Sequence, residues 1–573
     1  MERNKVKKFV VENKFLIFVM LMAFFLMFTN LGNRYLQPDE THTALFSKGV
    51  LETGKPYVVH NDQTITYAHV NNLMYNTSFH PESTASFLWI EQPWLDFYVC
   101  ALSFKLFGIS NFSAKFLFAI IGLATVFLFY FFSLKISDNK SVAKISTLIL
   151  ATSTVFYLYS RQSRYFSSIM FLTIAVLYAY LNLIENKKHS QLFLTLSLAF
   201  LFHSHFGIFL GMLITISLHF LLFKHYKTHL KPIIISYLLA FLLTAPWFIW
   251  ANVAGFYAQE VSFGWLYFFY VGIGFLYLFI ILGLPFIFIP FLPKLLNKKH
   301  IHNYALIFLS IITFILVISL HFEPPQMRYL IAFLPLICLI NGAIIYKIGK
   351  AIRSKKVSNI IVSTIVLLMI FTNLLAVFPL NFLPNLGVEA LFEGDEFDFN
   401  SKLFMEKAFK VKPLMTSYLY EITHDYDSAG EVIANYLQEN SKPTDTIISE
   451  VPGIDGFLMY YTNLKYATPL DTTPPTWVIL WASSSYPPES KIKQQKFIAF
   501  IDERYGLENY QKVVLNHSNS WSAETPNPIH HKFKTDLNGT ITLYHLKNNN
   551  KSELGNFIIP LKDNIQWWEE TSS

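Results

Sequence analysis

The sequence predicts a mainly α-helical, polytopic membrane protein followed by a smaller α/β domain. Only 14% of its 573 residues are charged and 53% are hydrophobic, whereas soluble domains carry about 25% charged residues. Long apolar runs recur through the first 380 residues. Beyond residue 381 the chain is more polar, and short strand-like and helix-like stretches alternate there. We therefore expect a membrane domain over residues 1–380 and a soluble domain over residues 381–573.

Eleven apolar runs are candidates for membrane-spanning helices. They cover residues 15–31, 113–134, 144–159, 167–184, 191–201, 207–223, 232–250, 265–291, 304–320, 329–346 and 358–378. Some are shorter than the roughly 20 residues that a full crossing needs. Together they predict a transmembrane helix bundle of about 11 spans.

Basic residues orient this bundle. They gather at the N-terminus and in every second loop, namely at Lys135, Lys140 and Lys144, at Lys187 and Lys188, at Lys224, Lys227 and Lys231, at Lys294, Lys298 and Lys299, and from Lys347 to Lys356. Loops rich in Lys and Arg stay in the cytoplasm. We expect a multi-pass protein of the bacterial inner (plasma) membrane with a cytoplasmic N-terminus. The long first outer loop, residues 32–112, and the C-terminal domain are then periplasmic or otherwise extracytoplasmic.

The net charge of +7 divides unevenly along the chain. From residue 381 onward there are 16 Lys and Arg against 25 Asp and Glu, or −9, which leaves 29 against 13, or +16, in the first 380 residues. The basic loops already have an explanation in topology, and an acidic tail is not typical of a nucleic-acid-binding protein. We expect membrane lipids and no nucleic acid among the partners.

The conspicuous polar residues of the membrane domain fall on the predicted outer side. They are Asp39 and Glu40, Glu91, Arg161 and Arg164, His203 and His205, and Glu323 and Arg328. Ionisable residues close to hydrocarbon are costly and usually functional. An ion-coupled transporter would place such groups near the middle of the membrane. This distribution therefore favours a site at the outer membrane surface.

The two carboxylates and the two arginines each have a second interpretation. Asp39 and Glu40 follow Pro38 and could simply begin a helix, where carboxylates stabilise free backbone N–H groups. Arg161 and Arg164 are three residues apart, so on a helix they would share a face and could bind one anionic group. They could equally extend toward lipid phosphates.

The two histidines, and the pair formed by Glu323 and Arg328, also have more than one interpretation. His203 and His205 could bind a metal together with a carboxylate, or they could pack at the interface. Glu323 and Arg328 could form a local ion pair.

Several short motifs occur in a fixed order relative to the spans. They are Pro38-Asp39-Glu40 with the downstream stretch from Gly49 to Gly54, Glu91-Gln92-Pro93-Trp94 with the stretch from Ala101 to Gly108, the run from Ser160 to Phe166, and Arg328-Tyr329 with Pro335. In these motifs the chain resembles membrane glycosyltransferases of the GT-C class, in the branch of protein O-mannosyltransferases and lipid A aminoarabinose transferases. The resemblance covers roughly residues 10–380. Relatives commonly have Glu-Lys-Pro-Pro where this chain has Glu91-Gln92-Pro93-Trp94, so a lysine that would be a candidate phosphate contact is missing.

This resemblance implies an enzyme that transfers a sugar from a polyprenyl-phosphate-linked donor to a lipid, polysaccharide or protein acceptor outside the membrane. A base must take a proton from the acceptor hydroxyl, and cations must stabilise the departing phosphate. A single displacement would invert the anomeric carbon. We assign the base to Asp39 with Glu91 as second carboxylate, phosphate binding to Arg161, Arg164 and Arg328, and supporting roles to Glu40, Tyr165, His205 and Tyr329. A divalent metal stays an open question. The alternative function is a transporter or flippase of a lipid-linked substrate.

The outer loop and the soluble domain have predictable elements. In the loop we expect a helix over residues 44–51 before a turn at Gly54, and an interfacial helix over residues 94–107 that ends at Gly108. The soluble domain should contain helices at 429–439, 457–462 and 492–505 and strands at 446–449, 477–481, 512–515 and 540–546. It has no glycine-rich phosphate loop and no nucleophile motif, so acceptor recognition or a lid are its open roles.

Overall fold

The protein is described by a computed structural model over residues 13–57, 59–60, 63–64, 89, 92–223, 229–250, 265–282, 301–320, 327–372, 375, 414–424, 428–449, 455–467, 473–480, 488–517 and 540–547. The chain divides into two compact units. The membrane unit comprises residues 1–31, 90–424 and 526–531, and the C-terminal unit comprises residues 32–89, 425–525 and 532–573. Most of the first outer loop thus belongs to the same unit as the C-terminal region.

The membrane unit is built from helices. They are α2 (Lys14–Phe28), α6 (Leu95–Phe107), α7 (Asn111–Ser137), α8 (Lys140–Ala151), α9 (Thr154–Ser160), α10 (Phe166–Ile184), α11 (Ser190–Ser204), α12 (Phe206–Leu222), α13 (Leu230–Trp250), α15 (Trp265–Leu282), α17 (Ile301–Ile318), the 3₁₀ helix η4 (Met327–Phe333), α18 (Leu334–Ala351), α19 (Lys355–Phe371) and α21 (Leu414–Thr423). Each of the eleven predicted apolar runs falls on one or two of these helices. The helix expected over residues 94–107 of the first outer loop also forms, as α6. It ends at Gly108, which has a φ of 77°.

The described helices account for part of the predicted number of spans. Five of them are long and apolar enough to cross a membrane alone, namely α7, α10, α13, α17 and the segment from η4 through α18. The pair α8 and α9, bent by 60°, would make a sixth. The apolar helices α2, α11 and α12 are shorter. A count of eleven crossings therefore remains a prediction.

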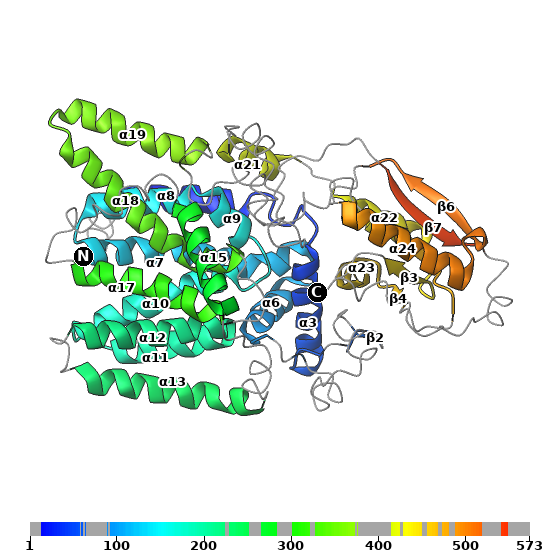
Figure 1. Cartoon of the computed structure of the whole chain (residues 1–573), viewed down its shortest axis with the longest axis horizontal. Coiled ribbons are helices and arrows are strands. Elements are labelled where there is room, and N and C mark those ends of the chain that lie inside the picture. The colour runs from blue at the N-terminus through cyan, green and yellow to red at the C-terminus, as the bar shows by residue number, and fades with distance from the viewer. Residues whose placement is uncertain are drawn as a thin grey trace. The chain divides into compact units, whose positions relative to one another are not determined.

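Helix packing in the membrane unit depends on small residues at the crossings. Helix α10 packs against α7 and α11, α12 packs against α17, and α18 packs against α8 (Figure 1). A Cβ added to Gly122 on α7 would lie 2.8 Å from the Cβ of Ser160, and one at Gly342 on α18 would collide with Ser146. These glycines let neighbouring backbones approach closely, so that α9 packs against α7 and α8 packs against α18.

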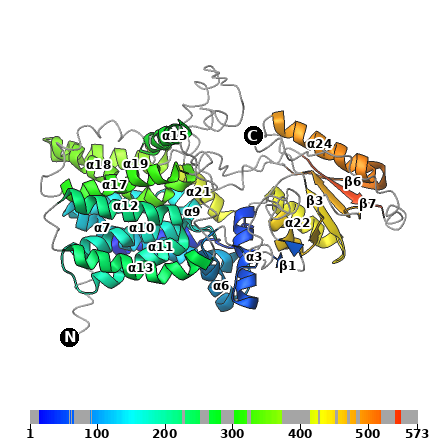
Figure 2. The same cartoon turned by 60° about the horizontal axis from the view of Figure 1, so that its bottom comes forward.

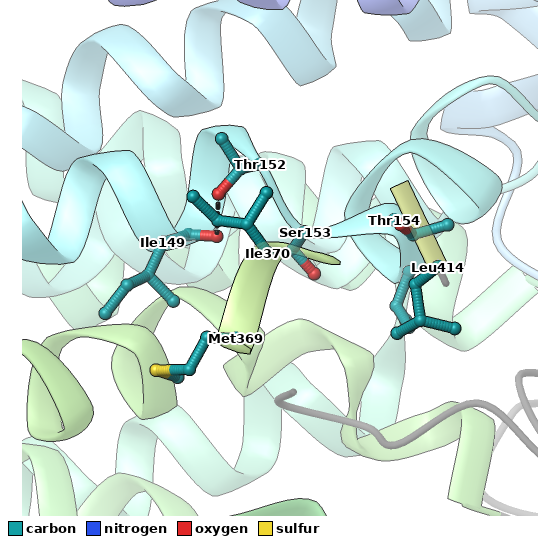
Figure 3. Close-up of a pocket in the computed structure, with 8 residues that line it drawn as sticks. Ile149, Thr152, Ser153, Thr154, Met369, Ile370 and Leu414 are labelled. Atoms are coloured by element: carbon teal, nitrogen blue, oxygen red, sulfur yellow. Dashed lines mark hydrogen bonds between the residues drawn. The ribbon is translucent and has the colours of Figure 1, made fainter. Parts of the chain in front are cut away.

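The break between α8 and α9 encloses a small cavity. Ser153 begins α9, and its hydroxyl accepts a hydrogen bond from the Phe156 amide at 3.4 Å. Figure 3 shows the cavity beside this break, lined by Thr152, Ser153 and Thr154 together with apolar residues of α19 and α21. Its volume is about 10 Å³, which is room for one water molecule at most. It is too small to hold a sugar.

The C-terminal unit is a mixed α/β structure, as predicted. Its elements are α3 (Pro38–Thr53), β1 (Val59–His60), β2 (Gln63–Thr64), α22 (Ala429–Asn440), β3 (Thr446–Ser449), α23 (Asp455–Thr462), β4 (Lys465–Tyr466), β5 (Trp477–Leu480), α24 (Pro488–Tyr505), η5 (Leu507–Asn509), β6 (Tyr510–Leu515) and β7 (Ile541–Leu546). The larger sheet has the order β4-β3-β5-β7-β6. Strand β3 is parallel to β4 and β5, while β7 is antiparallel to β5 and β6.

Both faces of this sheet are covered, which is why the middle strand β5 is apolar throughout. Along β5, Trp477 and Ile479 face a core formed with α22 and α23. The alternate residues Val478 and Leu480 face a second core formed with α24. Figure 2 shows α22 and α24 on opposite sides of the sheet.

Candidate active site

Three separate segments of the membrane unit bring aromatic rings together beside two arginines. Tyr165 lies in the turn before α10, His205 between α11 and α12, and Tyr329 in η4. The ring centroids of Tyr165 and His205 are 5.4 Å apart, and those of His205 and Tyr329 are 6.2 Å apart, both nearly perpendicular. Arg164 has its Cζ 5.4 Å from the ring of Tyr165, and Arg328 has its Cζ 5.6 Å from the ring of Tyr329. We call these five residues the aromatic–arginine cluster.

This cluster unites five residues that the sequence analysis singled out separately. The two arginines each lie next to their tyrosine in sequence, so those two contacts alone say little. The contacts of His205 are more informative. They join Tyr165, in the turn before α10, to Tyr329 in η4, which lies about 160 positions further along the chain. Two guanidinium groups in one cluster are suited to bind a phosphate.

Arg161 has a different place from Arg164. Residues 161–165 form a turn between α9 and α10, so the expectation that both arginines share one helix face is wrong. The Arg161 guanidinium donates hydrogen bonds to the carbonyls of Leu26, Thr29 and Asn30 at 3.0–3.3 Å, and to the hydroxyl of Tyr418 at 3.1 Å. Its contacts are those of a residue that fixes the C-terminal end of α2.

The two histidines also separate. His205 is the N-cap of α12, where its Nδ1 accepts a long hydrogen bond of 3.5 Å from the Ile208 amide. His203, on α11, lies 6.1 Å from the ring of Trp247, a contact that fits the packing interpretation. Among the described residues no group of three or more His, Cys, Asp or Glu side chains could hold a metal ion.

Asp96 is a residue of this region that the sequence analysis missed. It lies in the first turn of α6, is only 5% exposed, and accepts hydrogen bonds from Ser168 Oγ at 2.7 Å and Ser204 Oγ at 3.3 Å. Burial raises the pKa of its carboxyl group to about 7, and the two serines and the charge of Arg164 oppose this rise. A carboxylate in the first turn of a largely apolar helix, two residues after Glu91-Gln92-Pro93-Trp94, was the available signal.

Some buried hydroxyl groups near the arginines have no hydrogen-bond partner within the described part of the chain. They belong to Tyr159, Ser160 and Ser167. Tyr159 packs edge-on against Phe166 at 4.6 Å and lies within electrostatic reach of Arg328. Buried hydroxyls normally find a partner, so the Tyr159 hydroxyl is a candidate donor to a polar ligand beside Arg328.

The C-terminal unit carries two of the predicted carboxylates, Asp39 and Glu40. Glu40 is the third residue of α3, and its Oε2 accepts a hydrogen bond of 3.0 Å from the Gln37 amide. Glu40 therefore caps the helix. Asp39 is the second residue of α3 and is half-buried. Because Glu40 supplies the cap, the capping interpretation does not require Asp39. The third carboxylate, Glu91, lies outside the described residues.

The segment that leads into Asp39 is held by α23 of the same unit. The rings of Tyr35 and Tyr461 stack with centroids 4.2 Å apart, and the Leu36 amide donates a hydrogen bond to the Tyr461 hydroxyl. The Tyr35 hydroxyl in turn donates to Asn435 Oδ1 at 2.7 Å. Further along α3, Lys48 Nζ lies 4.3 Å from the ring centroid of Tyr460. The C-terminal region thus supports the helix that begins at Pro38.

A comparison of sequences identifies the central segment of the chain. Residues 91–250 match the family of dolichyl-phosphate-mannose-protein mannosyltransferases. Over these residues the chain is similar to that family. The predicted resemblance to GT-C glycosyltransferases is therefore confirmed. The matched segment includes Asp96, Arg164, Tyr165 and His205.

Individual relatives are distant. A protein of unassigned function from Aquifex aeolicus (strain VF5) is 25% identical over 248 residues, which are 41% of this chain and 43% of that protein. The chain thus spans less than half the length of this relative. Two crystal structures of ArnT from Cupriavidus metallidurans are similar over nearly the whole chain. The one bound to undecaprenyl phosphate has a TM-score of 0.52, 11% identity and coverage of 94% of this chain and 99% of that one. The apo structure has a TM-score of 0.51, 12% identity and coverage of 93% and 98%. The chain therefore has an ArnT-like fold.

Proposed function

We propose that this protein is an integral-membrane glycosyltransferase that moves a sugar from a polyprenyl-phosphate-linked donor to an acceptor on the outer face of the membrane. The observation that carries the proposal is the aromatic–arginine cluster, which gathers Arg164 and Arg328 around three aromatic rings. The match of residues 91–250 to the mannosyltransferase family and the likeness of the chain to an ArnT crystallised with undecaprenyl phosphate support the same donor class.

Arg164 and Arg328 bind the donor phosphate and stabilise the charge that develops on it as the bond to the sugar breaks. Tyr165, His205 and Tyr329 form apolar walls that fix the guanidinium groups and exclude water. Phosphate is already a good leaving group, so no strong acid is needed. Asp39 takes the proton of the acceptor hydroxyl as that oxygen attacks the anomeric carbon, with Glu91 as second carboxylate. One such displacement inverts the configuration.

Donor binding by purified protein in detergent tests this proposal. Undecaprenyl phosphate should bind to the wild type, and Arg164→Ala and Arg328→Ala should each weaken binding about 10- to 150-fold, because a hydrogen bond to a charged group contributes about 1.5–3 kcal/mol. The matched control is Arg504→Ala. Arg504 lies over its neighbour Tyr505 with Cζ 5.5 Å from the ring centroid, much as Arg164 lies over Tyr165, but in α24 of the C-terminal unit. Equal binding by all four proteins would refute the phosphate-binding role of the cluster.

A further inference from the structure

The carboxylate of Asp96 joins the two segments that carry most of the aromatic–arginine cluster. Its Oδ1 accepts from Ser168, which lies in the first turn of α10, three residues after Tyr165. Its Oδ2 accepts from Ser204, the last residue of α11, which directly precedes His205. One side chain on α6 thus contacts both the segment of Arg164 and Tyr165 and the segment of His205.

Charge links Asp96 to the same site. Arg164 is only 8% exposed, and a guanidinium that is removed from water requires compensation by negative charge or hydrogen bonds. The charges of Asp96 and Arg164 act on each other. The ionised carboxylate therefore stabilises the guanidinium in its buried position and orients it.

Stability alone does not favour a carboxylate at this position. Burial disfavours the ionised form of Asp96, as the rise of its pKa to about 7 shows. A neutral side chain of the same size could begin α6 without that desolvation cost. Residues that are costly for the fold but are kept beside a cluster of cations are typical of functional sites.

We propose that Asp96 is a positioning residue for donor binding, whose carboxylate holds the start of α10 and the end of α11 so that Arg164, Tyr165 and His205 keep their arrangement. This inference rests on the proposed function, since the ligand it concerns is the phosphate of the polyprenyl donor. Asp96 acts through Ser168, Ser204 and Arg164 and does not itself touch the donor.

The test compares donor affinity with thermal stability in the same detergent at pH 8. Asp96→Asn keeps the size of the side chain but removes the charge and one of the two acceptor oxygens. We expect the affinity for undecaprenyl phosphate to fall about tenfold or more, while the Tm stays equal to that of the wild type or rises. Ser168→Ala should weaken binding less, and Ser204→Ala less again, because its hydrogen bond is longer. The control is Ser310→Ala, a buried serine of α17 whose hydroxyl donates to Leu306 within its own helix; it should leave affinity unchanged.

A double-mutant cycle separates positioning from general support of the fold. If Asp96 acts through Arg164, then Asp96→Asn should change affinity much less in the Arg164→Ala background than in the wild type. Should Asp96→Asn fail to accumulate, the same cycle is run with Ser168→Ala, which leaves the charge in place.

Each remaining outcome is decisive. If the wild type binds undecaprenyl phosphate and Asp96→Asn or Ser168→Ala binds it equally well, the positioning role is overturned but the proposed function is not. A loss of affinity that accompanies an equal loss of Tm and persists in the Arg164→Ala background also overturns it. Failure of the wild type to bind undecaprenyl phosphate overturns both.

Discussion

Single charged residues of the two units divide into those whose contacts stabilise the fold and those that are costly to it. Arg161 and Glu40 satisfy backbone groups at helix ends, and their contacts explain their presence without a ligand. Asp96 and Arg164 are buried charged residues, which the fold alone does not require. The different contacts of Arg161 and Arg164 were not predictable from sequence. The two arginines lie three residues apart in one turn, and the local sequence does not show whether a guanidinium binds backbone carbonyls or a phosphate.

The pKa of Asp96 predicts how its removal alters stability with pH. The carboxyl group has a folded pKa of about 7, raised from 3.8 by burial. Between these values the folded protein holds a proton that the unfolded chain has lost, so the free energy of unfolding falls by about 1.4 kcal/mol for each pH unit. The stabilisation is complete below the unfolded pKa and is lost as the pH rises through 7. From pH 5 to pH 8 the wild type should lose about 3 kcal/mol that Asp96→Asn does not lose.

Thermal melts of the wild type and of Asp96→Asn between pH 5 and pH 8 measure this effect as a difference between their Tm values. The helices that pack against α6 also carry Lys115 on α7 and His203 on α11. Both groups are present in the wild type and in Asp96→Asn, so their contribution cancels in the comparison. A constant difference in Tm across this range would contradict the assigned ionisation of Asp96.

Arg161→Ala should act on stability and not on the donor. The substitution removes the hydrogen bonds that the guanidinium donates to the carbonyls of Leu26, Thr29 and Asn30 at the end of α2. It also removes the hydrogen bond to the Tyr418 hydroxyl. We expect a cost of about 1–3 kcal/mol and a lower Tm, with unchanged affinity for undecaprenyl phosphate in the protein that remains folded. A large loss of affinity at an unchanged Tm would restore the phosphate-binding role that the sequence suggested.

At the scale of elements, helix α3 and helix α23 form one structural piece although 400 residues of sequence lie between them. The two helices pack closely, because Gly456 of α23 has no side chain. A Cβ at this position would collide with the His42 ring on α3. The helix that carries Asp39 is therefore supported by the C-terminal region. Acceptor recognition and a lid were the roles left open by the sequence, and support of α3 is a third that only the structure suggests.

Tyr461→Phe tests this support with one atom. The variant keeps the ring that stacks on Tyr35 but removes the hydroxyl that accepts a hydrogen bond from the Leu36 amide, three residues before Asp39. We expect little change in Tm, unchanged donor affinity, and a severalfold fall in kcat for sugar transfer, since a misplaced base slows the chemical step. Tyr460→Phe is the matched control, because it removes the hydroxyl of the neighbouring tyrosine and retains the ring near Lys48. Unchanged kcat in Tyr461→Phe would show that α23 does not position Asp39.

Element types were predicted from sequence more successfully than contacts between elements. The helix beginning at Leu95 and the strand Trp477–Leu480 form where periodicity and turn residues indicated. The grouping of residues 32–89 with the C-terminal region was not predictable, because nothing local in either segment specifies its partner. The same reason explains why Asp96 was missed: its importance lies in Ser168 and Ser204, which are 72 and 108 positions away.

For the whole molecule, the distribution of basic loops predicts a cytoplasmic N-terminus and an outer C-terminal unit. Cysteine labelling in intact cells can test this in a background in which the two buried cysteines, Cys100 and Cys338, are replaced. A cysteine at the exposed position Asn440 should react with an impermeant maleimide, and one at the exposed position Lys188 should react only after the membrane is opened. Reaction of both in intact cells, or of neither, would show that the count of eleven spans is wrong.

The central claim is that a sugar leaves its polyprenyl phosphate and joins an acceptor, and mass spectrometry of that conversion tests it most directly. Purified protein in vesicles is supplied with polyprenyl-phosphate-linked sugars and an envelope extract as acceptor. The wild type should release free polyprenyl phosphate and form a glycosylated product. Asp39→Asn keeps the size of the side chain but removes the base, so transfer should fall by at least about 100-fold while donor binding persists. Glu40→Gln, which can still cap α3, should be nearly as active as the wild type. Donor that crosses the vesicle membrane with its sugar–phosphate bond intact, and no product with any acceptor, would contradict the account and favour a flippase.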